Sequence, residues 1–335
     1  MDDKRSSIPA TPTFATSLFM SPAFAGHDTG SHPENPGRFA AIRGALESSG
    51  LLVGRQLPKV EPARDEQITR VHSERHLQGL EAIVMQGGGW IDQDTVVDVH
   101  SLEIARFAAG AGIAAVDHVL AANEGQRHAF ALGRPPGHHA TPDRAMGFCL
   151  LNSIAISAAH ALDSGLERVA IIDWDVHHGN GTQEAFYGRN DLFFCSIHQW
   201  PLYPGSGASN ERGAGTGEGW TLNLPLPAGS DDLDYLEVFD RAVAPAVRAA
   251  RPQLILVSAG YDAHKDDPLG GMAVTTNGFR VLTQRVSALA DESCEGRLVF
   301  VLEGGYDLAA LTGSILASIA ELDQTQCRST ELQID

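Results

Sequence analysis

Two aspartates and a histidine alternate where a run of apolar residues ends, in the segment "VAIIDWDVHHGNG" that begins at Val169. In an extended strand, side chains two positions apart lie on the same face, so Asp173, Asp175 and His177 are expected to project together. Buried carboxylates are unfavourable unless a cation, hydrogen bonds or a proton neutralises them. The pattern therefore indicates a metal site, although a hydrogen-bonded cluster at a strand end would use the same residues.

A further carboxylate, Asp262, follows another apolar run, "QLILVSAG". Because ligands of open parallel sheets bind beyond the carboxyl ends of the strands, residues that follow different strands can meet at one site. Asp175, His177 and Asp262 together offer two carboxylates and one imidazole, which leaves a coordination position free for water, as in catalytic zinc sites. We therefore predict one catalytic zinc ion per chain on these three residues.

Two adjacent histidines, His138 and His139, follow the strand-like "HAFAL" and the turn "GRPPG". Adjacent histidines are common in ordinary polar loops. Beside a metal they gain a chemical role, because metal-activated water needs a base and the leaving group needs an acid, and imidazole serves as either near neutral pH. Asp173 and Asn180 are candidate hydrogen-bond partners that would fix the tautomers of the two rings.

Tyr306 follows a fourth apolar run and two glycines, in "LVFVLEGGYD". The glycines permit a sharp turn, which would leave the phenol beside the predicted metal. A phenol at that place can donate a hydrogen bond to a developing oxyanion. Taken alone, the residue is better explained as a core tyrosine near a strand end.

The elements that must position these groups alternate along the chain. Helical periodicity of apolar residues is clear at 38–48, 74–85, 101–122, 151–163, 233–250, 277–291 and 308–322. Apolar runs typical of buried strands lie at 128–132, 169–173, 192–197, 253–260 and 297–305, and a first strand is expected within 13–26. The alternation predicts an α/β fold with a mostly parallel central sheet and helices on both faces. We expect a single catalytic domain at 13–325, with flexible termini at 1–12 and 326–335.

The composition narrows the classes of function. The 335 residues carry a net charge of −18, which disfavours direct binding to nucleic acid and favours cationic substrates, although acidity also serves solubility. We find no run of about eighteen apolar residues, so no membrane span is expected. The four cysteines lie far apart without a C-x-x-C pair, which favours a reducing, cytoplasmic setting over a disulfide framework. The stretch at 13–26 imitates a signal peptide, but its interruption by serine and proline favours a strand.

Motifs of other enzyme classes are missing from the sequence. It contains no G-x-S-x-G, no G-x-x-x-x-G-K-[ST] and no H-E-x-x-H pattern. The glycine-rich "GAGTGEG" at 213–219 precedes the strand-like "WTLNLPL" and does not open a helix, so it does not predict a nucleotide site.

Five motifs occur in the order and approximate spacing of the histone deacetylase family: "HPENPGR", "GRPPGHHA" with "MGFCLLN", "IIDWDVHHGNGTQ", "SAGYDAHKDDPLGG" and "LEGGYD". Over residues 27–322 the chain most resembles the class II branch and the bacterial histone deacetylase-like amidohydrolases. The resemblance implies the arginase/deacetylase α/β fold. It also implies zinc-dependent hydrolysis of an acetylated amine, with release of acetate.

The resemblance implies that Asp175, His177 and Asp262 bind the zinc ion. It also implies that His138 and His139 transfer protons and that Tyr306 stabilises the transition state. It implies that His139 removes the proton of the attacking water, and that Tyr306 with zinc stabilises the tetrahedral oxyanion. The residues implied to contact the substrate are Asp94, Gly137, Phe148, Tyr203, Leu269 and Gly304. Among them Asp94 would hold the substrate backbone at the rim, and Tyr203 replaces the phenylalanine usual in the tunnel wall.

Structural potassium is also implied by the resemblance. One site would use Asp173, Asp175, His177, Ser196 and Ile197, several of them through backbone carbonyls. A second site would lie near Phe186, Arg189 and Leu192.

Other functions remain open for the same residues. An acetylpolyamine amidohydrolase resembles the chain in the same motifs, but a polyamine-selective member has glutamate in place of Leu269, and the apolar residue favours acyl-lysine. An arginase-like manganese enzyme needs more carboxylates than the segment around Asn180 supplies. A catalytically silent acyl-lysine binding protein would keep the same pocket. The expected partners are an acylated lysine peptide or protein, or an acylated small amine, and a homo-oligomer is allowed.

Overall fold

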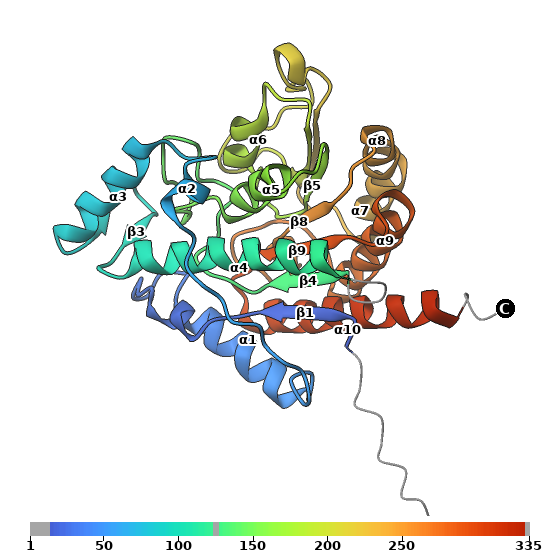
Figure 1. Cartoon of the computed structure of the whole chain (residues 1–335), viewed down its shortest axis with the longest axis horizontal. Coiled ribbons are helices and arrows are strands. Elements are labelled where there is room, and N and C mark those ends of the chain that lie inside the picture. The colour runs from blue at the N-terminus through green and yellow to red at the C-terminus, as the bar shows by residue number, and fades with distance from the viewer. Residues whose placement is uncertain (1–13, 123–126, 332–335) are drawn as a thin grey trace, which may run out of the picture.

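A computed structural model describes residues 14–122 and 127–331, with side chains up to residue 324. A seven-stranded sheet forms the centre of the molecule (Figure 1), in the order β1-β4-β9-β8-β5-β6-β7 with every neighbouring pair parallel. The strands are β1 (Thr16–Phe19), β4 (His128–Ala131), β5 (Val169–Asp173), β6 (Leu192–Gln199), β7 (Thr221–Leu226), β8 (Ile255–Ala259) and β9 (Leu298–Leu302). The predicted parallel sheet is therefore confirmed, and each predicted strand lies in it.

The central strands are buried on both faces, which is why they read as continuous apolar runs. All five residues of β5 are buried, and so are all those of β8 and β9. In the register of the sheet, Asp173 stands beside Ser196 of β6 and Ser258 of β8. Asp173, the last residue of β5, therefore places its carboxylate where the central strands end, between β6 and β8.

Helices cover both faces of the sheet (Figure 1). They are α1 (Pro36–Ser48), α2 (Asp65–Ile68), α3 (Glu74–Met85), α4 (Ser101–Ala121), α5 (Ser153–Asp163), α6 (Asn180–Phe186), α7 (Asp232–Val238), α8 (Ala244–Ala250), α9 (Thr276–Cys294) and α10 (Leu308–Glu331). α4 packs on β1, β4 and β9 and against α5, whereas α10 packs against α9 and α1. The predicted arrangement with helices on both faces is confirmed.

The predicted helix at 233–250 is interrupted. A π-helical turn at Phe239–Val243 separates α7 from α8. Pro245 lies in the first turn of α8, and its missing N–H removes the bond that would continue an α-helix to the carbonyl of Arg241. Periodicity of apolar residues cannot reveal such a change of hydrogen-bond register.

Several element ends differ from the prediction. α5 begins at Ser153 and not at residue 151, because the Asn152 side chain accepts a hydrogen bond from the backbone N–H of Ala155 and caps the helix. α10 continues to Glu331, past the predicted end at 322. The remaining residues of the expected flexible termini, 1–12 and 332–335, lie outside the described part of the chain, so the predicted domain limits stay predictions.

Short elements were missing from the prediction. α6 has seven residues and begins directly after the "DVHHG" segment, and a hairpin pairs β2 (Gly89–Trp90) with β3 (Val96–Val97). Neither is long enough to show a hydrophobic period.

α4 is the helix that bears on the expectation of no membrane span. By length and composition this alanine- and glycine-rich helix could cross a membrane, and it is the one such helix within the described residues. Most of its apolar stretch is buried inside the protein against the sheet and α5. Helices in the cores of soluble proteins pass the same test.

Candidate active site

Asp175, His177 and Asp262 meet beyond the carboxyl ends of the neighbouring strands β5 and β8. One potential ligand atom from each residue lies within 4.8 Å of the others. We call these three residues the metal cluster. The Nδ1 atom of His177 is 3.2 Å from Asp175 Oδ1 and 3.1 Å from Asp262 Oδ2. Both aspartates are fully buried and the imidazole is slightly exposed, so the cluster can be reached from one side.

The electrostatics of the metal cluster suit a cation. Burial and the charge of Asp175 raise the pKa of Asp262 to about 7. Against the effect of burial, the two carboxylates raise the pKa of His177 to about 10. Positive charge is therefore strongly favoured at the point between the three side chains. Two carboxylates and one imidazole are donors that zinc accepts, so the residues present fit a divalent metal ion.

The tandem histidines lie beside the metal cluster, and each has an acceptor at its Nδ1 atom. His138 Nδ1 lies 3.0 Å from Asp173 Oδ2, and His139 Nδ1 lies 2.8 Å from Asn180 Oδ1. The two ring centroids are 4.1 Å apart, and the ring of His139 is 5.8 Å from that of His177. The structure therefore places both predicted partners at hydrogen-bond distance from the predicted rings.

The two histidines differ in their expected charge. Against the effect of burial, the carboxylates of Asp175 and Asp173 raise the pKa of His138 well above its usual 6.5. Burial and the neighbouring charges of His138 and His177 hold the pKa of His139 well below 6.5. At neutral pH one ring holds a proton to give, and the other is free to accept one.

Asn180 also defines which nitrogen of His139 is free. Its Nδ2 group donates to the backbone carbonyl of His139 at 3.4 Å and lies 3.5 Å from the Met146 sulfur. This orientation leaves Oδ1 facing the ring, so the proton of neutral His139 sits on Nδ1. Its Nε2 lone pair is then available to a water molecule.

Tyr306 is held by residues from three other segments. Arg38 stands over its ring, with 5.0 Å from the guanidinium carbon to the ring centroid, and Phe148 packs edge-on with centroids 5.6 Å apart. Asp267 Oδ2 accepts a hydrogen bond from the Tyr306 backbone N–H at 2.6 Å. Burial and the carboxylates of the metal cluster raise the pKa of Tyr306 well above 10, so the phenol stays protonated and can donate.

The predicted wall residues Phe148 and Tyr203 lie against two of the predicted catalytic residues. Tyr203 stands edge-on to His139, with ring centroids 5.1 Å apart, and Phe148 contacts Tyr306. Phe148 has a φ of +70°, a strained value for an aromatic residue, and Gly147 before it has a φ of +58°. A Cβ on Gly147 would lie 2.6 Å from the His139 ring, so only glycine allows this approach.

The remaining predicted substrate contacts are linked to these walls through hydrogen bonds. The half-buried Asp94 accepts a hydrogen bond from the Thr95 hydroxyl at 3.2 Å, and that hydroxyl accepts one from the Phe148 N–H at 3.2 Å. The Leu269 N–H donates to Asp267, the same carboxylate that holds Tyr306. The rim and one wall are therefore connected to the catalytic segments.

Gly137 and Gly304 both make backbone hydrogen bonds to buried acids, and their predicted contact with the substrate stays a prediction. The Gly304 N–H donates to Asp175 Oδ2 at 2.9 Å, and the Gly137 N–H donates to Glu303 Oε2 at 2.6 Å. Their carbonyls accept hydrogen bonds from Tyr261 and from the backbone N–H of residue 140. A Cβ on Gly304 would lie 2.1 Å from Asp262 Oδ2, so these glycines permit close packing behind the site.

The residues predicted for potassium surround the end of β5. Asp173 Oδ1 accepts a hydrogen bond from the Asp175 N–H at 3.1 Å, and Ser196 Oγ lies 3.0 Å from His198 Nδ1. The second predicted potassium site lies in the segment between α6 and β6, where the Arg189 N–H donates a hydrogen bond to the Phe186 carbonyl at 3.0 Å. Both potassium sites stay predictions.

A buried ion network that the sequence interpretation did not single out lies behind Tyr306. Glu34 accepts two hydrogen bonds from Arg134, each of 2.7 Å, and lies 3.3 Å from Arg38 Nη1. Arg38 in turn donates to the backbone carbonyls of Gly305 and Glu303. The network ties the segment before the tandem histidines to the segment before Tyr306. The sequence does contain a signal for this network, because its charged residues lie inside the motifs "HPENPGR" and "GRPPGHHA".

This network predicts a pH-dependent part of the stability. Against the cost of burial, Arg134 and Arg38 lower the pKa of Glu34 from 4.5 to about 2. Since the folded pKa lies below the unfolded one, the stabilisation is complete above pH 4.5 and is lost as the pH falls toward 2. At roughly 1.4 kcal/mol per pKa unit it amounts to about 3 kcal/mol. We expect the difference in unfolding free energy between wild type and Glu34→Gln to be constant near neutral pH and to narrow below pH 4.5.

Urea unfolding of both proteins over a pH series measures this difference. Glu47→Gln is the matched control, because Glu47 pairs with Arg43 on the exposed face of α1. Its effect should stay below about 0.5 kcal/mol at every pH. A wild-type advantage over Glu34→Gln that does not change between pH 6 and pH 3 would contradict the prediction.

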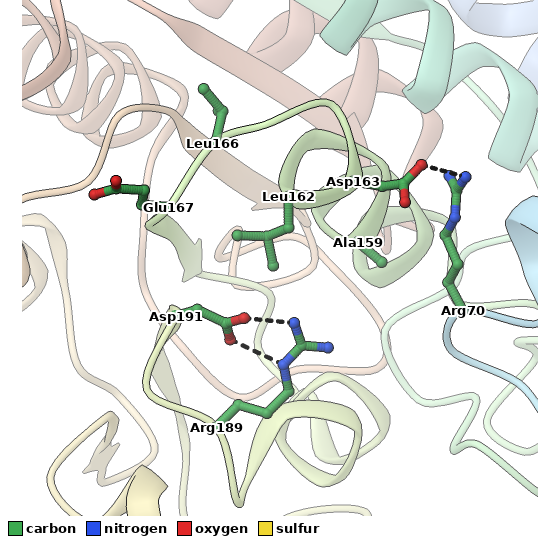
Figure 2. A pocket seen from close by; sticks show the side chains of 8 residues that line it. All are labelled: Arg70, Ala159, Leu162, Asp163, Leu166, Glu167, Arg189 and Asp191. Carbon is green, nitrogen blue, oxygen red and sulfur yellow. Dashed lines mark hydrogen bonds and ion pairs between the residues drawn. The ribbon is translucent and has the colours of Figure 1, made fainter.

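A hollow lies at the ends of the strands opposite to the candidate active site, and Figure 2 shows the residues that line it. Its volume is about 620 Å³, and its lining includes Leu166 and Glu167 just before β5 and Asp191 just before β6. Its two arginines are paired with acids of the same hollow, Arg70 with Asp163 and Arg189 with Asp191. The hollow is thus separate from the candidate active site and offers neutralised charges.

Comparison with known proteins agrees with this geometry. The family model described as histone deacetylase domain matches residues 32–322. A probable deacetylase of Archaeoglobus fulgidus is 42% identical over 307 residues, covering 90% of this chain and 85% of that protein. The histone deacetylase-like amidohydrolase of Pseudomonas aeruginosa is 43% identical over 303 residues, covering 90% and 78%. The crystal structure of the HDA15 HD domain matches with a TM-score of 0.87 at 34% identity, covering 92% of this chain and 89% of that chain.

Proposed function

This chain belongs to the histone deacetylase family, and we propose that it is a zinc-dependent amidohydrolase that removes acetyl or other acyl groups from lysine side chains or similar amines. The observation that carries the proposal is the convergence of the metal cluster, the tandem histidines and Tyr306 at one edge of the sheet. The choice of zinc rests on the donor set. The choice of an acylated amine as the substrate rests on the family and on relatives named as deacetylases and as an amidohydrolase.

When bound by the metal cluster, a zinc ion would polarise the amide carbonyl and lower the pKa of a water molecule. His139, neutral and with its Nε2 atom free, accepts the proton of that water. Tyr306 donates a hydrogen bond to the amide oxygen, which becomes an oxyanion when water adds to the carbonyl carbon. His138, protonated beside Asp173, supplies the proton that the departing amine requires. The products are acetate and the free amine.

Acetate release from an acetyl-lysine peptide tests this function. We expect release that is abolished by a chelator and restored by zinc. Binding of the peptide without acetate release, in a protein that carries one zinc per chain, would identify the chain as a silent acyl-lysine binding protein.

The same assay with N-acetylputrescine tests the polyamine alternative. The half-buried Leu269 offers no charge to a distant ammonium group, so we expect a kcat/KM at least tenfold lower for the polyamine, on the order of one lost ion pair. A preference for N-acetylputrescine would assign the chain to the polyamine enzymes.

Two further parts of the proposal concern the ions and the compartment. We propose structural potassium at the end of β5, where Asp173 and Ser196 stand side by side in the register of the sheet. We also propose a cytoplasmic location. Three cysteines have described side chains, and all three are free and buried, which suits a reducing compartment.

A further inference from the structure

Glu303 is a buried acid whose side chain bridges two segments of the candidate active site. Its Oε2 atom accepts hydrogen bonds from the backbone N–H groups of Gly137, at 2.6 Å, and His138, at 3.1 Å. Gly137 follows β4 and Glu303 follows β9, and these strands are parallel neighbours. A single carboxylate oxygen therefore joins the segment that carries the tandem histidines to the segment that carries Tyr306.

The fold alone does not account for an acid at this position. Glu303 is fully buried, and within the described part of the chain its Oε1 atom has no hydrogen-bond partner. A buried carboxylate with an unpartnered oxygen is unfavourable for folding, and an apolar residue would pack there at lower cost. What the carboxylate adds is one acceptor placed to receive two successive backbone N–H groups.

The segment that Glu303 holds is also confined from its other side. A Cβ on Gly137 would lie 2.5 Å from the backbone nitrogen of Ser153, at the start of α5. The backbone before His138 is thus pressed against a helix end and hydrogen-bonded to Glu303. On the other segment, Arg38 donates to the Glu303 carbonyl at 2.6 Å and stands over the ring of Tyr306. The segment of the tandem histidines and the segment of Tyr306 are therefore both held by hydrogen bonds next to Glu303.

We propose that Glu303 is a positioning residue: its carboxylate holds the backbone of the tandem histidines in place relative to Tyr306. Glu303 touches no reacting atom and acts through the N–H groups of Gly137 and His138. The inference rests on the proposed hydrolase function, because the base and the oxyanion donor must address the same substrate carbon. A displacement of about 1 Å between such groups lowers turnover by about 10²-fold.

Glu303→Leu and Glu303→Gln together test the proposal, since glutamine keeps an acceptor oxygen and leucine does not. In Glu303→Leu we expect kcat to fall about 30- to 100-fold with KM within threefold of wild type and one zinc per chain retained. In Glu303→Gln we expect kcat within about threefold of wild type. Hydrogen–deuterium exchange of the peptide that contains Gly137 and His138, measured after chelation, should be faster in Glu303→Leu and close to wild type in Glu303→Gln.

Glu321→Gln is the matched control, a buried glutamate on α10 that accepts a hydrogen bond from Arg280, and it should change neither kcat nor this exchange. Wild-type kcat in Glu303→Leu, or a Glu303→Gln variant as impaired as Glu303→Leu, would overturn the proposal. If wild type releases no acetate, the proposed function fails separately. The exchange of the two amides then still decides whether Glu303 holds the segment.

Discussion

Replacing Asp262 with alanine is expected to abolish stoichiometric metal binding and to lower amide hydrolysis by at least about 10³-fold, since water activation depends on the ion. Asp262 contributes one of the two carboxylates of the metal cluster, and its Oδ2 atom lies 3.1 Å from His177 Nδ1. Without it, Asp175 and His177 offer one carboxylate and one imidazole, too few donors for a catalytic zinc site. Elemental analysis of the purified variant measures the metal content directly.

Asp266→Ala is the matched control for this variant. Asp266 lies four residues further along the chain with its side chain mostly exposed, and its carboxylate is 3.6 Å from His264 Nδ1. We expect the control to keep one metal ion per chain and wild-type turnover. Asp262 also accepts a hydrogen bond from the Val176 N–H at 2.8 Å, so thermal unfolding must show that Asp262→Ala is folded at the assay temperature. One zinc per chain in the folded variant would show that the ligand set is wrong.

The groups that the sequence placed best are those at the ends of buried strands. Asp175 and Asp262 follow apolar runs that became the neighbouring strands β5 and β8, and parallel strands bring their carboxyl ends to one edge. His138 precedes its predicted partner Asp173 by 35 positions, yet the two meet because β4 and β5 lie in the same sheet. The positions of such residues could be predicted from the apolar runs of the strands and from the rule that the carboxyl ends of parallel strands meet at one edge of the sheet.

The supporting charges could not be found in the same way. Glu34 and Arg134 are 100 positions apart, and Glu303 and Gly137 are 166 positions apart. No period or spacing relates such residues, and a single charged side chain in a loop is more often exposed than buried. Their pairing depends on how the loops pack after the strands are placed. The hydrogen bonds that Gly137 and Gly304 donate to Glu303 and Asp175 could not be predicted either, because backbone N–H groups carry no sequence signal of their partners.

Replacing Tyr306 with phenylalanine is expected to lower kcat by about 10²- to 10³-fold, as for the loss of one oxyanion-hole donor. The reason lies in the pKa of the phenol, which burial and the metal cluster raise well above 10, so that the hydroxyl keeps its proton throughout the neutral range. Phenylalanine preserves the edge-on contact with Phe148 and the stacking of Arg38, and the backbone N–H still donates to Asp267. The change therefore removes a hydrogen-bond donor and leaves the walls of the site in place.

Steady-state kinetics on an acetyl-lysine peptide separate this role from a packing role. An interaction made only in the transition state lowers kcat and kcat/KM by the same factor, so KM should stay within about threefold of wild type. Tyr261→Phe is the matched control, because the hydroxyl of the fully buried Tyr261 donates a hydrogen bond at 3.1 Å to Ser318 of α10. That variant should lose some stability and keep its turnover. Full activity of Tyr306→Phe with one metal ion per chain would mean that the phenol does not stabilise the oxyanion.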